Sequence, residues 1–203
     1  MKQVIKLSTV YQQVISQINC DAQLNQDEIE HFISLLRFRK IKKNQFLMQR
    51  GEIAQFDTFV KSGCLKSSFI DEQGMEHIVQ FAIEDEWISD YESLTNRTPA
   101  RLEIMALEDS ELLQLDHESL EHLFEIHPKF EHIFRKKNQR SFVNLYKCLI
   151  SFMSSSAEER YIEFVRQHPK FVNRIPQYQI ASYLGITPEY LSKIRRNLTV
   201  NGS

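Results

Sequence analysis

The chain has 203 residues, of which 42% are hydrophobic and 26% are charged, and its formal net charge is −2. This composition is sufficient for a compact core and fits one large and one small domain. The chain lacks any run of about 18 apolar residues, and polar residues interrupt its N-terminus too often for a signal peptide, so we expect a cytoplasmic protein.

The charge is distributed unevenly along the chain. Residues 1–134 contain 13 Lys and Arg against 23 Asp and Glu, net −10, whereas residues 135–203 contain 12 against 4, net +8. A basic surface attracts phosphate backbones because binding releases counterions, while an acidic surface is repelled. The C-terminal third is therefore the part expected to bind a nucleic acid.

Cysteines and histidines give no indication of a metal site or of a disulfide framework. The cysteines are odd in number and far apart, at positions 20, 64 and 148. Four histidines recur every five residues, but five helical steps turn neighbouring side chains apart, so we expect no metal at His117, His122, His127 and His132.

Catalytic motifs are also missing from the sequence. It contains no nucleotide-binding glycine loop, no Gly-x-Ser-x-Gly elbow and no His-Glu-x-x-His pair, and only 5 glycines in total. We therefore expect no enzymatic activity and no bound cofactor.

The N-terminal two thirds predict one helix followed by short strands. Asn25-Gln26-Asp27-Glu28 is typical of a helix cap, and apolar residues continue at helical spacing to about Arg37. Short β-like runs separated by turn residues then predict an antiparallel barrel or jelly roll. These runs are Gln45–Met48, Asp57–Lys61, Cys64–Ile70, His77–Ala82, Leu102–Ala106 and Glu111–Leu115. The gap at residues 83–100 is expected to include a short helix around Tyr91–Leu94.

A long helix is predicted after the barrel. A short helix at Ser119–Ile126 precedes it, and Pro128 opens it at the start of a stretch that continues to about Met153. Its apolar residues recur at three-, four- and seven-residue steps, which indicates one stripe against the barrel and a second against the same helix of another copy. The alternative is a helix buried within one subunit. The residues assigned to the dimer interface are Phe134, Phe142, Leu145, Leu149 and Phe152.

The C-terminal stretch at residues 174–198 predicts two short helices joined by a tight turn. Ser154–Ser156 precedes it as a hinge, and Ser156 is positioned to cap a helix at Ala157–His168. The first helix of the pair is predicted from about Pro176 to Leu184, and Gly185 ends it because glycine adopts the left-handed conformation without steric cost. Thr187 then caps a helix that ends near Leu198.

The last helix has two distinct faces. Leu191, Ile194 and Leu198 form an apolar stripe, and the outward positions include three cations and one anion. This layout is typical of a recognition helix that enters the DNA major groove. The alternative is an ordinary helical hairpin whose polar face only maintains solubility.

The order of these parts resembles the Crp/Fnr family of bacterial transcription regulators over about residues 20–198. The sequence QIASYLGITPEYLSKIRRNL resembles the family's helix-turn-helix, and GEIAQFDTFVKSGCLKSSFIDEQGMEHIVQFAIEDEWISDYESL resembles its cyclic-nucleotide-binding-like domain. The Asp90–Ser93 region is similar to the branch found in Bacteroidetes-type bacteria.

The resemblance implies an α+β protein in three parts. We expect an antiparallel β-barrel or jelly-roll sensor domain with its N-terminal helix at residues 1–127, a dimerisation helix at 128–153 and a helix-turn-helix domain at 154–203. It further implies a homodimer on a pseudo-palindromic operator, and it leaves RNA polymerase open as another partner. The alternative is a signal-binding or protein-interaction module with a degenerate helix-turn-helix.

The resemblance also implies the DNA contacts. Pro188, Glu189 and Lys193 correspond to positions that face base edges, and Gln179, Thr187 and Arg196 to positions near phosphates. Glu189 can accept a hydrogen bond from cytosine N4, and Lys193 can donate to guanine O6 and N7. The complete set of expected contact residues adds Gln177, Tyr190, Ser192 and Arg195.

The expected effector region departs from the family's cyclic-nucleotide pattern. Cyclic-nucleotide binders of the family use a Gly-Glu-Leu turn and, some ten residues later, an arginine that pairs with the phosphate. The matching positions in this chain are Ser89, Asp90 and Tyr91, followed by Ala100 and Arg101. Alanine stands at the position of the phosphate-pairing arginine, so we expect no binding of cyclic AMP. A different small effector, or none, remains open.

Overall fold

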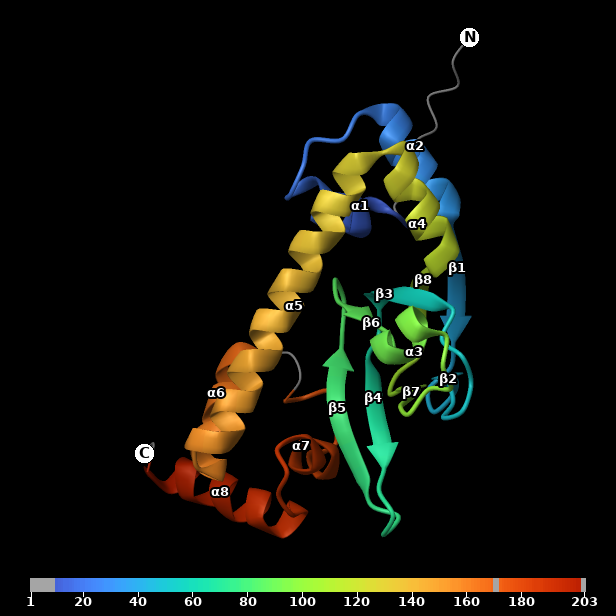
Figure 1. Cartoon of the computed structure of the whole chain (residues 1–203). Coiled ribbons are helices and arrows are strands. Elements are labelled where there is room, and N and C mark those ends of the chain that lie inside the picture. The colour runs from blue at the N-terminus through green and yellow to red at the C-terminus, as the bar shows by residue number, and fades with distance from the viewer. Residues whose placement is uncertain (1–9, 170–171, 202–203) are drawn as a thin grey trace. The chain divides into compact units, whose positions relative to one another are not determined.

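The computed structural model describes residues 10–169 and 172–201, which form two compact units (Figure 1). Unit 1 combines the residues up to Ser67 with Phe81–Gln139, and unit 2 combines Ser68–Gln80 with the residues from Arg140 onward. The long helix therefore begins in unit 1 and ends in unit 2. The expected three-part division of the chain stays a prediction.

Within the described part of the chain, eight strands form two four-stranded sheets. They are β1 (Leu36–Ile41), β2 (Phe46–Met48), β3 (Phe56–Ser62), β4 (Leu65–Ile70), β5 (Glu76–Ala82), β6 (Trp87–Ile88), β7 (Glu103–Ala106) and β8 (Ser110–Asp116). The first sheet has the order β1-β8-β3-β6 and the second β2-β7-β4-β5. The pairings of β1 with β8, β3 with β8 and β3 with β6 are antiparallel. The predicted combination of helices with an antiparallel β domain is confirmed.

The helices of unit 1 come before, between and after the strands. They are α1 (Gln12–Asn19), α2 (Gln26–Leu35), α3 (Tyr91–Asn96), α4 (His117–Ile126) and the start of α5 (Pro128–Ser154). A capping box opens α2, because Asn25 Oδ1 accepts from the Glu28 N–H while the Glu28 carboxylate accepts from the Asn25 N–H. The predicted cap is therefore present.

The first sheet is buried on both faces because its central strands alternate between two cores. Phe59 and Leu113 belong to an aromatic core, whereas Val60 and Leu112 belong to a core of mainly aliphatic residues. Side chains of successive strand residues point to opposite faces, so neighbouring positions enter different cores. This explains why four consecutive residues are buried in both β3 and β8.

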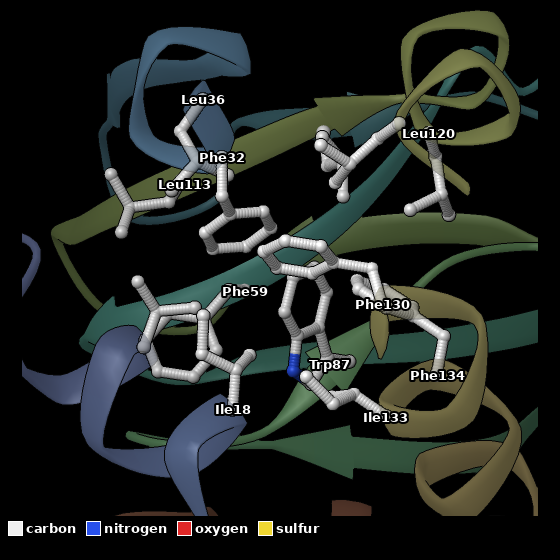
Figure 2. Packing of buried hydrophobic residues seen from close by; sticks show 13 residues of the cluster. Ile18, Phe32, Leu36, Phe59, Trp87, Leu113, Leu120, Phe130, Ile133 and Phe134 are labelled. Atoms are coloured by element: carbon white, nitrogen blue, oxygen red, sulfur yellow. The ribbon is translucent and has the colours of Figure 1, made fainter. Parts of the chain in front are cut away.

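The aromatic core joins the helices of unit 1 to the first sheet, as Figure 2 shows. Phe32 from α2 stacks on Phe130 from α5 with ring centroids 5.3 Å apart, and Trp87 packs edge-on against Phe59 and Phe134 at 5.4 and 5.8 Å. Such arrangements are favoured because the positive edge of one ring meets the negative face of another.

Unit 2 contains the rest of α5 and three further helices, α6 (Ala157–Gln167), α7 (Gln177–Tyr183) and α8 (Pro188–Asn201). Ser156 caps α6 in a second capping box with Glu159, as the sequence predicts for this serine. The turn of the β4–β5 hairpin, at residues 68–80, also belongs to this unit. Over the described ranges, every helix is too short or too polar to cross a membrane.

Several sequence-based expectations need correction. Helix α2 ends at Leu35 instead of Arg37, because β1 begins directly at Leu36, and α1, β1 and β6 were not predicted. Tyr11 provides no side-chain cap for α1, and β1 has no alternating burial pattern. Phe134 is also misplaced in the dimer interface, since it is only 4% exposed and packs inside unit 1 against Phe32, Trp87 and Phe124.

A buried ion pair links α5 to the first sheet. Lys137 Nζ pairs with Asp57 Oδ2, and the exposed fractions of the two side chains are only 14% and 6%. The same ammonium group lies 4.3 Å from the Trp87 ring centroid and 5.1 Å from that of Phe134, which adds cation–π attraction. Asp57 Oδ1 also accepts a hydrogen bond of 3.0 Å from the Tyr91 hydroxyl.

We predict that Lys137→Met lowers the free energy of unfolding by about 3 kcal/mol, because it leaves the Asp57 charge buried without its cation. The double variant Asp57→Asn with Lys137→Met should recover most of this loss, since asparagine can still accept from Tyr91 and carries no charge. Urea denaturation of the two variants measures both effects. The exposed neighbour Lys136 provides the control, and Lys136→Met should change stability by less than about 0.5 kcal/mol. A double variant as unstable as the single one would contradict this account.

Candidate nucleic-acid interface

The helix-turn-helix is held together by a small apolar core. Ile180 and Ala181 of α7 and Leu191 and Ile194 of α8 are all at most 2% exposed. Gly185 has φ +67°, the left-handed conformation expected of it. The Ile186 N–H then donates to the Ala181 carbonyl at 3.0 Å, which closes the turn.

Arg160 of α6 connects this core to the hinge by hydrogen bonds, a role that the sequence does not reveal. Its guanidinium donates to the carbonyls of Ser155 at 2.8 Å and Leu184 at 3.1 Å, and it lies 4.9 Å from the Phe152 ring centroid. One side chain therefore joins the start of α6 to the C-terminal end of α7. A charged residue in an amphipathic helix carries no sequence signal for such carbonyl partners.

The outward face of α8 presents polar and charged side chains from a rigid support. Glu189, Ser192, Lys193 and Arg196 are exposed and stand at i, i+3, i+4 and i+7, which places them on one face opposite the buried stripe. Thr187 caps the helix by accepting from the Tyr190 N–H at 3.2 Å. The remaining expected contact residues of this helix, namely Pro188, Tyr190 and Arg195, are also exposed.

This face has the chemistry needed to read base edges. Lys193 provides three donors for guanine acceptors, Glu189 provides acceptors for the cytosine amino group, and Arg196 provides a cation for a phosphate. The side chains project from a helix, the element that fits the major groove of B-form DNA.

The two glutamines of α7 differ from this pattern. Gln177 is half-buried, and Gln179 is 4% exposed, so Gln179 is not at the surface where a phosphate contact requires it. Gln179 Nε2 donates to the Tyr178 hydroxyl at 3.2 Å. The Oε1 atoms of both glutamines are buried and have no hydrogen-bond partner among the described residues.

The second half of α5 carries an uncovered apolar surface within unit 2. Phe142, Leu145, Leu149 and Phe152 are between 46% and 63% exposed, and Val143, Tyr146, Ile150 and Met153 extend the same surface. Phe142 and Tyr146 are in ring contact, with centroids 4.8 Å apart. We call these eight residues the α5 apolar face.

The expected effector region in unit 1 is largely occupied by the chain itself. Asp90 is 3% exposed and caps α3 by accepting from the Ser93 N–H at 3.0 Å. Its second carboxylate oxygen accepts from the N–H groups of Arg101 and Leu102, each at 3.2 Å. Three backbone donors therefore converge on one internal anion.

The other residues of the effector region are divided between core and surface. Ser89 is buried and donates to the Phe56 carbonyl at 3.0 Å, and Ala100 is buried in the aliphatic core. Arg101 is exposed. Burial of the Tyr91 hydroxyl group and the adjacent Asp57 carboxylate raise the pKa of Tyr91 well above its usual value, so the phenol stays a hydrogen-bond donor.

Comparison with known proteins identifies relatives of this chain. Residues 38–127 match a family model described as the cyclic nucleotide-binding domain. The regulatory protein HlyX of Actinobacillus pleuropneumoniae is 23% identical over 192 residues, covering 89% of this chain and 79% of the relative.

Two solved structures have a similar fold. FixK2 from Bradyrhizobium japonicum matches with a TM-score of 0.73 and 18% identity, covering 82% of this chain and 86% of that one. A Crp/Fnr-family regulator from Eubacterium rectale matches with a TM-score of 0.68 and 17% identity, covering 88% and 85%. HlyX and the Eubacterium rectale protein are both named as regulators. The chain therefore carries a cyclic nucleotide-binding domain at residues 38–127 and is similar over most of its length to regulators of the Crp/Fnr family.

Proposed function

We propose that the protein acts as a homodimer that reads a pseudo-palindromic operator through α8 and does not respond to cyclic AMP. The observation that carries the proposal is the exposed face of α8, where Glu189, Lys193 and Arg196 project from a helix whose opposite side is buried. A two-fold axis would present this face twice, so each half-site would receive one helix.

Within this proposal the exposed residues have different roles. Glu189 and Lys193 read base edges, because their charged ends can pair with cytosine N4 and with guanine O6 and N7. Thr187 and Arg196 contact phosphates, which fix the register of the helix but carry no sequence information. The net charge of +8 over residues 135–203 adds affinity that is independent of sequence.

Sequence selection by the purified full-length protein tests these roles. Selection from a random pool of duplexes should enrich an inverted repeat, and Glu189→Ala should change the preferred base at one position of each half-site, because the acceptor for cytosine N4 is lost. The matched variant Arg196→Ala should weaken binding to all sequences alike and reduce the slope of log affinity against log salt by about one per subunit.

Arg166 provides the control, since it is a basic residue of unit 2 that pairs with Glu163 on its own helix at 2.6 Å. Arg166→Ala should leave both sequence preference and salt slope unchanged. Failure of the wild-type protein to enrich any motif, together with binding that is insensitive to salt, would instead favour a protein-interaction module.

The proposed dimer rests on the α5 apolar face. Isolated apolar residues are common at protein surfaces, but eight adjacent ones form a patch of the kind that marks an interaction site. A second copy of the same helix is its occupant in this proposal, because a two-fold axis makes such a face self-complementary.

Leu149→Glu should convert the dimer into monomers. Burying one leucine stabilises by about 1.5–3 kcal/mol, and symmetry doubles the loss to about 3–6 kcal/mol, at least about a hundredfold in the dissociation constant. Sedimentation equilibrium measures this change. Asn144 lies on the opposite side of α5, so Asn144→Glu should leave the dimer intact. Equal dissociation of both variants, or of neither, would argue against this interface.

The lack of a response to cyclic AMP follows from the internal anion at Asp90. A cyclic phosphate that sought the same backbone N–H groups would have to displace a carboxylate that belongs to the chain, and the two negative charges would repel. Ala100 offers no cation in compensation.

Isothermal titration of the protein with up to about 1 mM cyclic AMP should therefore give no saturable heat, because even a micromolar site would saturate in this range. Binding to the selected operator should be the same with and without the nucleotide. Saturable binding at micromolar concentrations would disprove this part of the proposal.

A further inference from the structure

One serine of the helix-turn-helix is hydrogen-bonded to a strand of the β domain. In unit 2, Ser182 Oγ donates to the Glu76 carbonyl at 2.8 Å and accepts from the Ile78 N–H at 3.2 Å. Figure 1 shows α7 beside β5, the strand that carries both backbone groups. A single hydroxyl thus pairs a donor and an acceptor that lie two residues apart.

The geometry corresponds to the pairing of an edge strand. β5 is the last strand of its sheet, and the backbone groups of Glu76 and Ile78 point to the same side because residues i and i+2 share an orientation. An open edge presents such unpaired groups, and proteins commonly cover them. The Ser182 hydroxyl takes the place that a neighbouring strand would occupy.

The hairpin that carries this edge is itself well braced. His77, between the two paired residues, stacks on Phe69 with ring centroids 5.0 Å apart, and its Nε2 lies 2.6 Å from Asp71 Oδ2. Asp71 Oδ1 in turn accepts from the Gln73 and Met75 N–H groups at 3.0 and 2.8 Å. A hairpin fixed at its turn in this way offers a defined docking edge.

Ser182 shares a face of α7 with a glutamine expected at the DNA backbone. Gln179 precedes Ser182 by three residues, and side chains at i and i+3 are neighbours on a helix. Gln179 is 4% exposed, and its Oε1, like that of Gln177, has no hydrogen-bond partner among the described residues. Burying an unpaired polar atom is unfavourable, so this arrangement persists only because other contacts hold it.

We propose that the Ser182 contact with β5 is an autoinhibitory clamp, in which the hairpin holds α7 by the face that DNA binding requires. The inference rests on the proposed function, since it assumes that α7 approaches the DNA backbone. Release from β5 frees Gln179 for a phosphate and makes the helix-turn-helix competent. Only the released form binds DNA in this proposal. The observed affinity is therefore the intrinsic affinity multiplied by the fraction of molecules that are released.

The test compares three full-length proteins, the wild type, Ser182→Ala and Ser182→Thr, on the operator obtained by selection. Ser182→Ala removes both hydrogen bonds to β5, so it should bind DNA about thirtyfold more tightly, a change of about 2 kcal/mol. Ser182→Thr keeps a hydroxyl donor and acceptor and should bind like the wild type. An affinity of Ser182→Ala equal to that of the wild type within twofold would overturn the clamp, as would weaker binding, which would make Ser182 a DNA contact.

Amide hydrogen exchange of Ile78 separates failure of the clamp from failure of the proposed function. The Ile78 N–H should exchange slowly in the wild type, and faster both in Ser182→Ala and when the wild type is bound to DNA. If the wild type and both variants bind no DNA while Ile78 is protected only where a hydroxyl is present, the contact exists but the proposed function is wrong. If Ile78 exchanges alike in all three proteins, the clamp itself is wrong.

Discussion

The carboxylate of Asp57 is the point at which the strands, α3 and α5 of unit 1 meet. It lies on β3, pairs with Lys137 of α5 and accepts from Tyr91 of α3. A buried ion pair contributes little net stability, because desolvation of the two charges offsets their attraction. Its role is to define position, since moving either partner would leave a buried charge unpaired. Beyond Lys137, every residue of α5 up to Ile150 is exposed, so this pair marks where the helix leaves the β domain.

This anchoring gives α5 two different environments along one continuous helix. Phe130, Ile133 and Phe134 are buried in the aromatic core, and thirteen consecutive exposed residues follow Lys137. The buried part of α5 is therefore fixed by the aromatic core, and the exposed part carries the α5 apolar face.

The sequence predicted the elements whose patterns are local, and it missed those that depend on tertiary contacts. The helix-turn-helix was predictable because Gly185, the Thr187 cap and the Leu191–Ile194 stripe each have a local signature. By contrast, β1 continues the apolar spacing of α2, and only its pairing with β8 makes it a strand. Phe134 has the spacing of an interface residue, and the side to which it turns is decided by Phe32 and Trp87, far away in the sequence. Ser182 and Arg160 bond to backbone groups, which leave no trace in residue types.

The internal anion at Asp90 lies in the expected effector region of the β domain. Asp90 binds three backbone N–H groups, and the next residue, Tyr91, donates to Asp57, so the start of α3 is held by side chains of the chain itself. An effector that acted through a phosphate would compete with a carboxylate whose effective concentration is very high because it is covalently attached. An effector that instead replaced the Tyr91 hydroxyl at Asp57 would meet a single hydrogen bond, worth about 1.5–3 kcal/mol because the acceptor is charged. Of these two contacts, the Tyr91–Asp57 bond is therefore the one that costs less to replace, and Asp57 in turn pairs with Lys137 of α5.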